Sequence, residues 1–264
     1  MSDRILLFIP MYNCERQIAR VLDQLTPRAQ ALLSGLIVVD NRSTDKGQAV
    51  AAERIKSLQI LANVLMNDGN YGLGGSHKVA FEYALAHAFD YVIVLHGDDQ
   101  GSIEDILPYL ERREHLGLDA LLGARFMKGS KLEGYSAVRT LGNYGFNMLY
   151  SVVSSYPIKD LGSGLNLYRV GALADRWWLK NANDLTFNYH MMLKSIDRGW
   201  KMKFFPLTWR ESDQVSNVKL VRQSLRVAEI ALRYGAMRRK YLANDYSDRP
   251  DGAYPSTVVA GHAC

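Results

Sequence analysis

Tyr91-Val92-Ile93-Val94-Leu95-His96-Gly97-Asp98-Asp99-Gln100 is where this chain changes most abruptly from apolar to acidic residues. The apolar run, rich in β-branched residues, is typical of a buried strand in a parallel sheet. Open α/β folds bind ligands at the carboxyl ends of such strands. Carboxylate and amide oxygens suit Mg²⁺ or Mn²⁺, which also take phosphate oxygens from a substrate. The stretch therefore indicates either a metal and phosphate site or only the cap of a following helix, since Ser102 and Asp105 resemble a capping box.

Strand and helix patterns alternate before this stretch. Apolar runs at residues 5–9, 36–39 and 60–66 predict three earlier strands, and helical patterns separate them. Such alternation predicts an α/β protein with a mostly parallel, doubly wound sheet. The second half is less regular, and it predicts strands at 120–126, 165–168 and 202–207 and helices at about 137–154, 187–198 and 218–233.

Polar side chains follow each of the first four strands, in residues 10–15, 40–45, 70–75 and 98–100. Helix caps, first-turn acids or turn glycines explain any one cluster. Four clusters at the carboxyl ends of parallel strands predict a single crevice. A divalent cation would make this acidic crevice attractive to phosphates, and Arg125 would add charge-assisted hydrogen bonds. We therefore expect a nucleoside diphosphate, with its base and ribose near Asp40.

The composition sets wide limits on function. The 264 residues are 48% hydrophobic and 22% charged, as in an ordinary globular protein, and the formal net charge is +5. This mild excess fits an anionic ligand or membrane surface and is too small to indicate a nucleic acid partner. Cys14 and Cys264 form no metal or redox motif. No signal peptide or transmembrane-length apolar run is apparent, so we expect a cytoplasmic protein, able to rest peripherally on the inner face of a membrane.

Six segments resemble motifs of the family 2 glycosyltransferases. Residues 10–15 resemble the opening motif of that family, 38–45 its nucleoside-binding motif and 70–75 its N-x-G-x-x-x loop. Residues 96–100 resemble the D-x-D-x-Q metal segment of the branch that contains dolichyl- and polyprenyl-phosphate sugar synthases. Residues 123–126 resemble the G-S-R-(F/Y) segment of that branch, and residues 160–169 resemble its D-x-x-S-G…Y-R segment.

The resemblance implies a GT-A fold, a UDP- or GDP-sugar donor, a Mg²⁺ or Mn²⁺ cofactor and inversion at the anomeric carbon. It implies that Asp98 and Gln100 hold the metal and that Asp98 and Arg125 act in catalysis. His96 departs from the family pattern, because it stands where the first aspartate of D-x-D is expected. The residues expected at the donor are Pro10, Tyr12, Asn13, Glu15, Asp40, Ser43, Asp45, Asn70, Gly72, His96 and Asp98.

Several acceptors and functions remain open at this point. A polyprenyl phosphate or lipid-linked acceptor, as in the resembled branch, is already an anion and needs only cationic positioning. A sugar hydroxyl would need a general base, and Asp184 stands where the family usually has it. Loss of the first D-x-D acid is also compatible with a non-catalytic nucleotide-sugar-binding module. A dinucleotide-binding oxidoreductase fits less well, because residues 69–75 lack G-x-G-x-x-G spacing. Candidate acceptor-binding residues are Arg139, Ser163, Arg169, Arg210, Ser216 and Lys219.

The expected organisation is one catalytic domain followed by a helix. We predict a GT-A catalytic domain at residues 1–216, with a nucleotide-sugar-binding half at 1–134 and an acceptor half at 135–216. An amphipathic helix within 217–243 carries an apolar stripe and a basic stripe. It either packs on the domain through the apolar stripe or lies in a membrane interface. Residues 244–264, which include two prolines, are expected to be loose.

Overall fold

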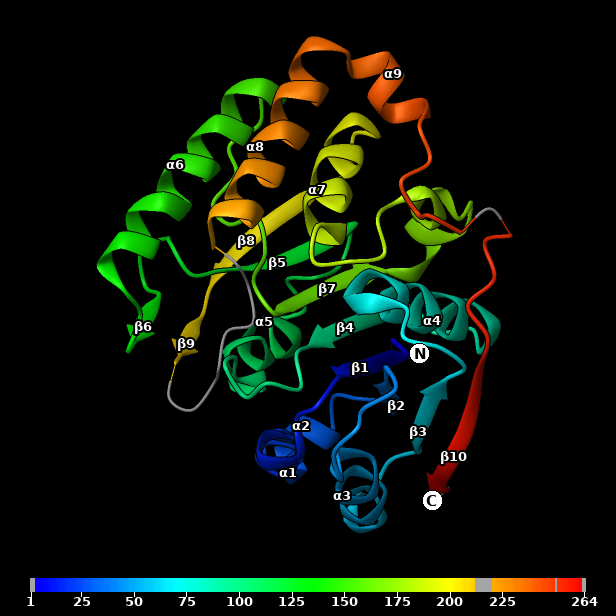
Figure 1. Ribbon diagram of the computed structural model, residues 1–264. Helices are drawn as coiled ribbons and strands as arrows, with labels where there is room; N and C mark the ends of the chain where they lie inside the picture. Colours follow the sequence, from blue (N-terminus) through cyan, green and yellow to red (C-terminus); the bar gives the residue numbers. More distant parts are fainter. Residues whose placement is uncertain (1–2, 212–219, 250, 263–264) are drawn as a thin grey trace.

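The computed structural model describes residues 3–211, 220–249 and 251–262, and it contains an eight-stranded sheet (Figure 1). The strand order is β10-β3-β2-β1-β4-β7-β5-β8. The strands are β1 (Ile5–Met11), β2 (Gly35–Asp40), β3 (Ala62–Asn67), β4 (Tyr91–Leu95), β5 (Ala120–Ala124), β7 (Leu165–Arg169), β8 (Met202–Pro206) and β10 (Ser256–His262). The short strands β6 (Lys131–Glu133) and β9 (Thr208–Arg210), which the sequence did not suggest, pair in parallel beside it.

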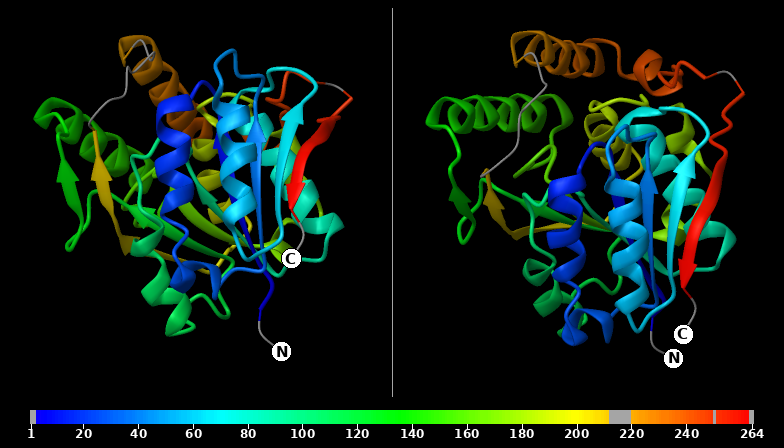
Figure 2. Two further views of the ribbon diagram at one scale, coloured as in Figure 1. Left: turned by 90° about the horizontal axis from the view of Figure 1, so that it is seen from below. Right: turned by 60° about the horizontal axis from the view of Figure 1, so that its bottom comes forward.

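Helices cover both faces of the sheet (Figure 2). One face carries α1 (Glu15–Asp23), α2 (Pro27–Gln30), α3 (Gly47–Arg54) and α5 (Leu107–Glu111). The other face carries α4 (Gly72–Ala86), α6 (Ala137–Ser154), α7 (Phe187–Asp197), α8 (Leu220–Ala236) and α9 (Arg238–Ala243). The described residues also form four short 3₁₀ helices: η1 (Ile55–Ser57), η2 (Ile103–Asp105), η3 (Val170–Leu173) and η4 (Trp177–Lys180). Among all these helices of the described residues, none is both long and apolar enough to cross a bilayer.

The register of the parallel strands brings their carboxyl ends to one edge. Strand β1 pairs in parallel with β2 and β4, and β2 pairs in parallel with β3. The predicted mostly parallel α/β sheet is therefore confirmed. Strand β7 runs antiparallel to both β4 and β5, and its first residue, Leu165, lies opposite Leu95 at the end of β4. The residues just before β7 consequently reach the same edge as the ends of β1 to β4.

The C-terminal segment corrects the expectation of a loose tail. Strand β10 pairs antiparallel with β3 along its length and forms one margin of the sheet. The turn before it is also held, because Tyr71 Oη and the backbone N–H of Asp68 both donate to the carbonyl of Pro255. In the sequence this segment looks irregular, because it contains two prolines and only a short alternation of polar and apolar residues. The helix expected within 217–243 is present in its described part as α8 and α9.

A buried lysine links α4 to the C-terminal segment. The ammonium of Lys78 is fully buried and donates to the carbonyls of Leu179 and Asn181 and to Asn183 Oδ1. It also lies 2.9 Å from the hydroxyl of Tyr254 and above the ring of that residue. Three elements that are far apart in the sequence thus share one cation.

We expect this lysine to make stability depend on pH. Burial lowers the pKa of Lys78 to about 7, from about 10.5 in an unfolded chain. Between these values the unfolded chain binds more protons, so the free energy of unfolding should rise with pH, by up to about 1.4 kcal/mol per pH unit. Urea denaturation at pH 7.5, 8.5 and 9.5 would measure this slope. Lys78→Met should reduce the slope, while the exposed Lys128→Met should leave it unchanged; equal slopes in all three proteins would contradict the argument.

Candidate active site

A cleft of about 1070 Å³ opens at the edge where the parallel strands end. It collects residues from the loops that follow β1 to β5 and from α6 and the segment before α7. This convergence is what the strand pattern predicted. Of the predicted site residues, those that line the cleft are Pro10, Tyr12, Asn13, Glu15, Asp45, Asn70, Gly72, His96, Asp98, Gln100, Arg125, Arg139 and Asp184.

The loops after β1 and β2 are cross-linked by reciprocal hydrogen bonds. The side chain of Asn13 accepts from the backbone of Thr44, and Ser43 Oγ accepts from the backbone of Asn13. Likewise Asp45 accepts from the N–H of Glu15, and Glu15 accepts from the N–H of Lys46. Side-chain acceptors of each loop thus satisfy backbone N–H donors of the other loop. The two loops form one preformed wall of the cleft.

Asp40 and Ser43 do not line the cleft, although both were expected at the donor. The carboxylate of Asp40 is buried and accepts from the backbone of Ser43 and from the side chain of Gln48. The hydroxyl of Ser43 serves the loop linkage described above. Both residues support the wall from behind, so the contact of Asp40 with a base or ribose remains a prediction.

Asn41, which lies in the predicted cluster after the second strand but was not among the expected donor-binding residues, organises the loop that carries Asn70. Its amide donates to Asn70 Oδ1, and its carbonyl oxygen accepts from Asn67 and from the backbone of Tyr71. Its position directly after Asp40, in the same motif, is the feature of the sequence that could have identified Asn41 as a site residue. Gly72 follows with a φ of 71°, and a Cβ there would lie 2.4 Å from the carbonyl oxygen of Asn183. Glycine therefore lets this loop approach the segment that carries Asp184.

Asp98 and Asp99 point in different directions, although the negative charge of Asp99 still contributes to raising the pKa of Asp98. Asp98 lines the cleft, and its Oδ1 accepts from the backbone of Gln100. Asp99 instead accepts a hydrogen bond from Arg20 of α1 at 2.6 Å and another from Gln24, the residue that follows α1, at 3.1 Å. Burial raises the pKa of Asp98 to about 6. Asp99 therefore anchors the loop, while Asp98 faces the ligand space.

His96 occupies the floor of the cleft beside Asp98. Its Nδ1 lies 3.9 Å from Asp98 Oδ2, and its buried Nε2 has no hydrogen-bond partner in the described part of the chain. Burial lowers its pKa to about 4, and the nearby Arg125 adds to this effect. The imidazole is consequently neutral at pH 7 and has a nitrogen lone pair to offer.

Arg125 is held by Asp160 in a bidentate ion pair. Its Nε and Nη2 donate to the two carboxylate oxygens at 2.8 and 2.9 Å, and its backbone N–H donates to the same carboxylate. Only 10% of the Arg125 side chain and 1% of the Asp160 side chain are exposed. Burial alone would lower the pKa of Arg125, but Asp160 raises it further than burial lowers it. Within the described residues no acceptor is recorded for Nη1, so this nitrogen is the donor that a phosphate could use.

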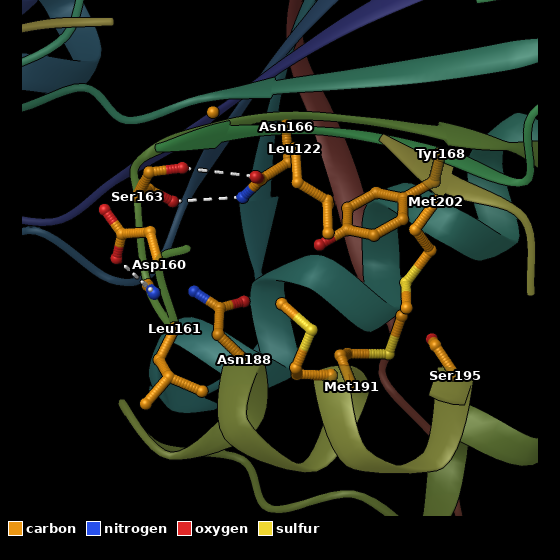
Figure 3. Close-up of a pocket in the computed structure, with 13 residues that line it drawn as sticks. Leu122, Asp160, Leu161, Ser163, Asn166, Tyr168, Asn188, Met191, Ser195 and Met202 are labelled. Atoms are coloured by element: carbon orange, nitrogen blue, oxygen red, sulfur yellow. Dashed lines mark hydrogen bonds between the residues drawn. The ribbon is translucent and has the colours of Figure 1, made fainter. Parts of the chain in front are cut away.

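Ser163, an expected acceptor-binding residue, is buried below the cleft. Its hydroxyl donates to the carbonyl of Leu165. Its hydroxyl and its carbonyl are also hydrogen-bonded to the side-chain amide of Asn166 (Figure 3). It lines a separate cavity of about 20 Å³ between β7 and α7, where Asn188 Oδ1 has no partner among the described residues. This space is sufficient for about one water molecule. Direct contact of Ser163 with an acceptor is therefore not what the structure indicates.

The expected acceptor-binding arginines have different surroundings. Arg139 lines the cleft, where Glu211 accepts from its Nη1 at 2.6 and 2.7 Å. Arg169 lies opposite Tyr91, at the other end of β4, and pairs with Asp119, so its expected role is corrected by the antiparallel direction of β7. Arg210 pairs with Glu133 beside the cleft without lining it. Ser216 and Lys219 lie outside the described residues.

Asp184 is at the cleft, but its carboxylate is already engaged. Its Oδ1 accepts from the backbone and hydroxyl of Thr186, and its Oδ2 forms an ion pair with Arg226 of α8. Burial raises its pKa, but these hydrogen bonds outweigh burial and leave the pKa below the ordinary value. A carboxylate stabilised in this way is a weak base.

Several cleft residues were not predicted from the sequence, among them Arg16, Gln17, Ser76, Trp209 and Glu211. Arg16 lines the cleft as an exposed cation, and the described residues give it no acidic partner. Trp209 is the middle residue of β9, and Glu211 directly follows that strand. The ring of Trp209 lies 4.8 Å from the Arg125 guanidinium. The run Leu207-Thr208-Trp209-Arg210 follows β8 directly, and strand β9 was not distinguishable from it by pattern.

Comparisons with known proteins agree with this geometry. Glycosyl transferase family 2 matches the chain over residues 7–177. A polyprenol monophosphomannose synthase from Mycolicibacterium smegmatis is 20% identical over 238 residues, 88% of each protein. An uncharacterized protein from Methanocaldococcus jannaschii is 26% identical over 167 residues, 63% of this chain and 65% of that one. The chain thus spans slightly less than two thirds of the archaeal relative.

The fold has solved counterparts. A crystal structure of glucosyl-3-phosphoglycerate synthase from Mycobacterium tuberculosis, in complex with Mn²⁺, uridine diphosphate and phosphoglyceric acid, is similar to this structure with a TM-score of 0.65. The sequence identity is 15%, and the match covers 99% of this chain and 89% of that one. With a family match over more than half of its length, the chain belongs to glycosyl transferase family 2, has the GT-A fold and is a glycosyltransferase near the branch of polyprenyl-phosphate sugar synthases.

Proposed function

We propose that this glycosyltransferase moves a sugar from a nucleoside-diphosphate sugar to the phosphate of a polyprenyl phosphate or similar lipid-linked acceptor, with inversion and with a divalent cation. The observation that carries the proposal is the convergence of the four strand-end clusters on one cleft that contains Asp98. The name of the mycobacterial relative supports the acceptor class. Residues 1–134 would bind the donor and residues 135–216 the acceptor. A location at the cytoplasmic face of a membrane is part of this proposal, because donor and lipid acceptor would meet there.

The residues of the cleft fit a Mg²⁺ or Mn²⁺ ion that is shared with the donor. Asp98 and Gln100 offer oxygen ligands, and His96 lines the same cleft with its Nδ1 3.9 Å from Asp98 Oδ2. The described residues contain no cluster of three His, Cys, Asp or Glu side chains that would hold a metal alone. Donor phosphates and water would supply the remaining ligands, as Mg²⁺ sites commonly require. When bound, the ion would neutralise charge on the departing nucleoside diphosphate.

The chain itself would position both reactants. Residues of the β1, β2 and β3 loops would bind the nucleoside, and Arg125 Nη1 would donate to a donor phosphate. An acceptor phosphate oxygen forms the new bond to the anomeric carbon as the bond to the nucleoside diphosphate breaks on the opposite face. The tight ion pair with Asp160 keeps the guanidinium in place without reorganisation, which favours electrostatic stabilisation.

A phosphate acceptor fits the cleft better than a hydroxyl acceptor does. A hydroxyl must lose a proton, whereas Asp184 has a lowered pKa and is bonded to Thr186 and Arg226. A phosphate oxygen is already anionic. We therefore expect Asp184→Asn to change kcat less than about tenfold. A loss in the range of about 10²–10⁴-fold, as expected for removal of a general base, would favour the hydroxyl acceptor instead.

The proposal can be tested by a donor and acceptor screen. UDP- and GDP-sugars are incubated with Mn²⁺ or Mg²⁺ and a short-chain polyprenyl phosphate in detergent, and released nucleoside diphosphate is measured. We expect one donor to turn over and to form a glycosylated lipid only when the acceptor carries its phosphate. The anomeric carbon of the transferred sugar should have the inverted configuration. Matched reactions with the corresponding polyprenol, which lacks the phosphate, serve as the control. Turnover with the polyprenol alone, or with none of the donors, would reject the proposed reaction.

A further inference from the structure

Helix α6 exposes a row of apolar side chains. Val138, Leu141, Met148 and Val152 are between 70% and 81% exposed. Their spacing of three, seven and four residues places them along one side of the helix. The opposite side, with Asn147, Tyr150 and Ser154, faces the core. A surface helix normally turns its apolar side inward, so this outward row requires an explanation.

Helix α8 exposes a second apolar row. Of the two alternatives for the apolar stripe of this helix, packing on the domain is not what the structure shows, because Val221, Leu225 and Leu232 are between 60% and 75% exposed. The helix packs through a different set of residues instead, namely Val227, Ile230, Ala231 and Tyr234. The helix is therefore apolar on two sides, and only one of them is used by the described fold.

Helices α6 and α8, which carry the two rows, lie side by side (Figures 1 and 2). Tyr150 of α6 donates through its hydroxyl to the carbonyl of Val227 of α8, and Gly235 of α8 lies against Val153 of α6. Val152 and Leu232 are close in sequence to this contact. We call the seven residues Val138, Leu141, Met148, Val152, Val221, Leu225 and Leu232 the α6–α8 face.

Basic residues accompany the α6–α8 face. Helix α6 has a single charged residue, Arg139, and residues 220–243 contain six basic residues against one acidic residue. In the described residues Arg222, Arg239 and Lys240 have no acidic partner, whereas Arg226, Arg233 and Arg238 are paired. An apolar face beside unpaired cations is complementary to an anionic lipid surface. Pairing with the same face of a second copy would bring like charges together.

The α6–α8 face also adjoins the cleft. Arg139 lies one residue after Val138 and lines the cleft, and Arg226 lies one residue after Leu225 and pairs with the cleft residue Asp184. A bilayer in contact with this face would present lipid headgroups near the acceptor side of the cleft. A lipid acceptor could then reach the site while its chain stays in the bilayer.

We infer that the α6–α8 face docks on an anionic membrane surface, with the apolar side chains in the headgroup region and Arg222, Arg239 and Lys240 against anionic lipids. The binding step requires no turnover. Only its consequence, the delivery of a lipid-linked acceptor, rests on the function proposed above. The face thereby identifies the part of the molecule that contacts the membrane.

Vesicle flotation tests this inference without donor or acceptor. The purified chain is mixed with phosphatidylcholine vesicles, or with vesicles that also contain 30% phosphatidylglycerol (about one lipid in three, a strongly anionic surface). We expect flotation only with the anionic vesicles and a decrease at high salt. The double variant Met148→Glu/Leu225→Glu should lose at least about tenfold in vesicle affinity, because charge replaces inserted apolar surface. The matched control Leu116→Glu alters an exposed leucine elsewhere and should bind as the parent does.

Other outcomes overturn the inference. Absence of flotation of the parent chain, or equal flotation of the parent and the double variant, would reject the face as a membrane surface. A dimer detected by light scattering that the double variant dissociates would assign the face to a second copy of the chain. Circular dichroism and thermal melting would show that the variants are folded. These measurements use no sugar nucleotide. A negative result for membrane binding can therefore be distinguished from a negative result in the donor and acceptor screen.

Discussion

Asp98→Ala is expected to reduce kcat/KM for the nucleotide-sugar donor by about 10³-fold or more, because the variant loses the carboxylate that is proposed to hold the metal. Binding of UDP or GDP in the presence of Mn²⁺, measured by calorimetry, should weaken together with activity. Stability should not fall, because burial raises the pKa of Asp98 and ionisation of this carboxylate therefore costs stability at neutral pH. A stable variant without metal-dependent binding is the expected result.

The adjacent carboxylate provides the matched control for this experiment. Asp99 is bonded to Arg20 and Gln24 rather than facing the cleft. Asp99→Asn should therefore retain donor binding and activity within a few-fold, and a partly exposed ion pair of this kind is worth about 1 kcal/mol or less. Loss of metal-dependent binding in Asp99→Asn with retention in Asp98→Ala would reverse the assignment.

The second large effect is expected at the buried ion pair between Arg125 and Asp160. Asp160→Asn keeps the shape of the side chain but leaves the guanidinium without its counter-charge. Removal of one partner from such a pair costs about 3–5 kcal/mol. Urea denaturation should show this loss in the free energy of unfolding. The double variant Arg125→Met/Asp160→Asn should lose less than the sum of the single variants, because the two changes act on one interaction.

An exposed ion pair serves as the reference for that measurement. Arg169 pairs with Asp119 at the opposite edge of the sheet, where 45% of the Arg169 side chain is exposed. Arg169→Ala should cost only about 0–1 kcal/mol. If Asp160→Asn cost no more than Arg169→Ala, the ion pair would not hold Arg125 in place, and the positioning argument for Arg125 would fail.

The strand-end clusters were predictable from the sequence because their placement follows from local rules. An apolar run followed by polar residues marks the carboxyl end of a strand, and parallel strands share that edge. Asn13, Asn70 and Asp98 therefore converge in the cleft as expected. The same local rules do not predict which side chain of a cluster faces the ligand. Asp40 and Asp45 occur in one motif, yet only Asp45 lines the cleft, because Asp40 is taken up by Ser43 and Gln48.

The remaining differences come from long-range pairing. An apolar run predicts a strand without giving its direction, so the antiparallel course of β7, which sends Arg169 away from the cleft, was not predictable. The same holds for β10, whose pairing with β3 decides its conformation. The partners of Arg125 and Asp184 lie 35 and 42 residues away in the sequence, at Asp160 and Arg226. Composition alone could not identify those pairs.

The pairing of β10 with β3 has a consequence for biosynthesis. Tyr71, in the loop of residues 70–75, is hydrogen-bonded to Pro255, and Lys78, in the middle of α4, contacts Tyr254. These partners leave the ribosome after every other strand of the sheet, since chains emerge from the amino terminus onward. The contacts that join Tyr71 and Lys78 to the C-terminal segment can therefore form only after the rest of the sheet has been synthesised.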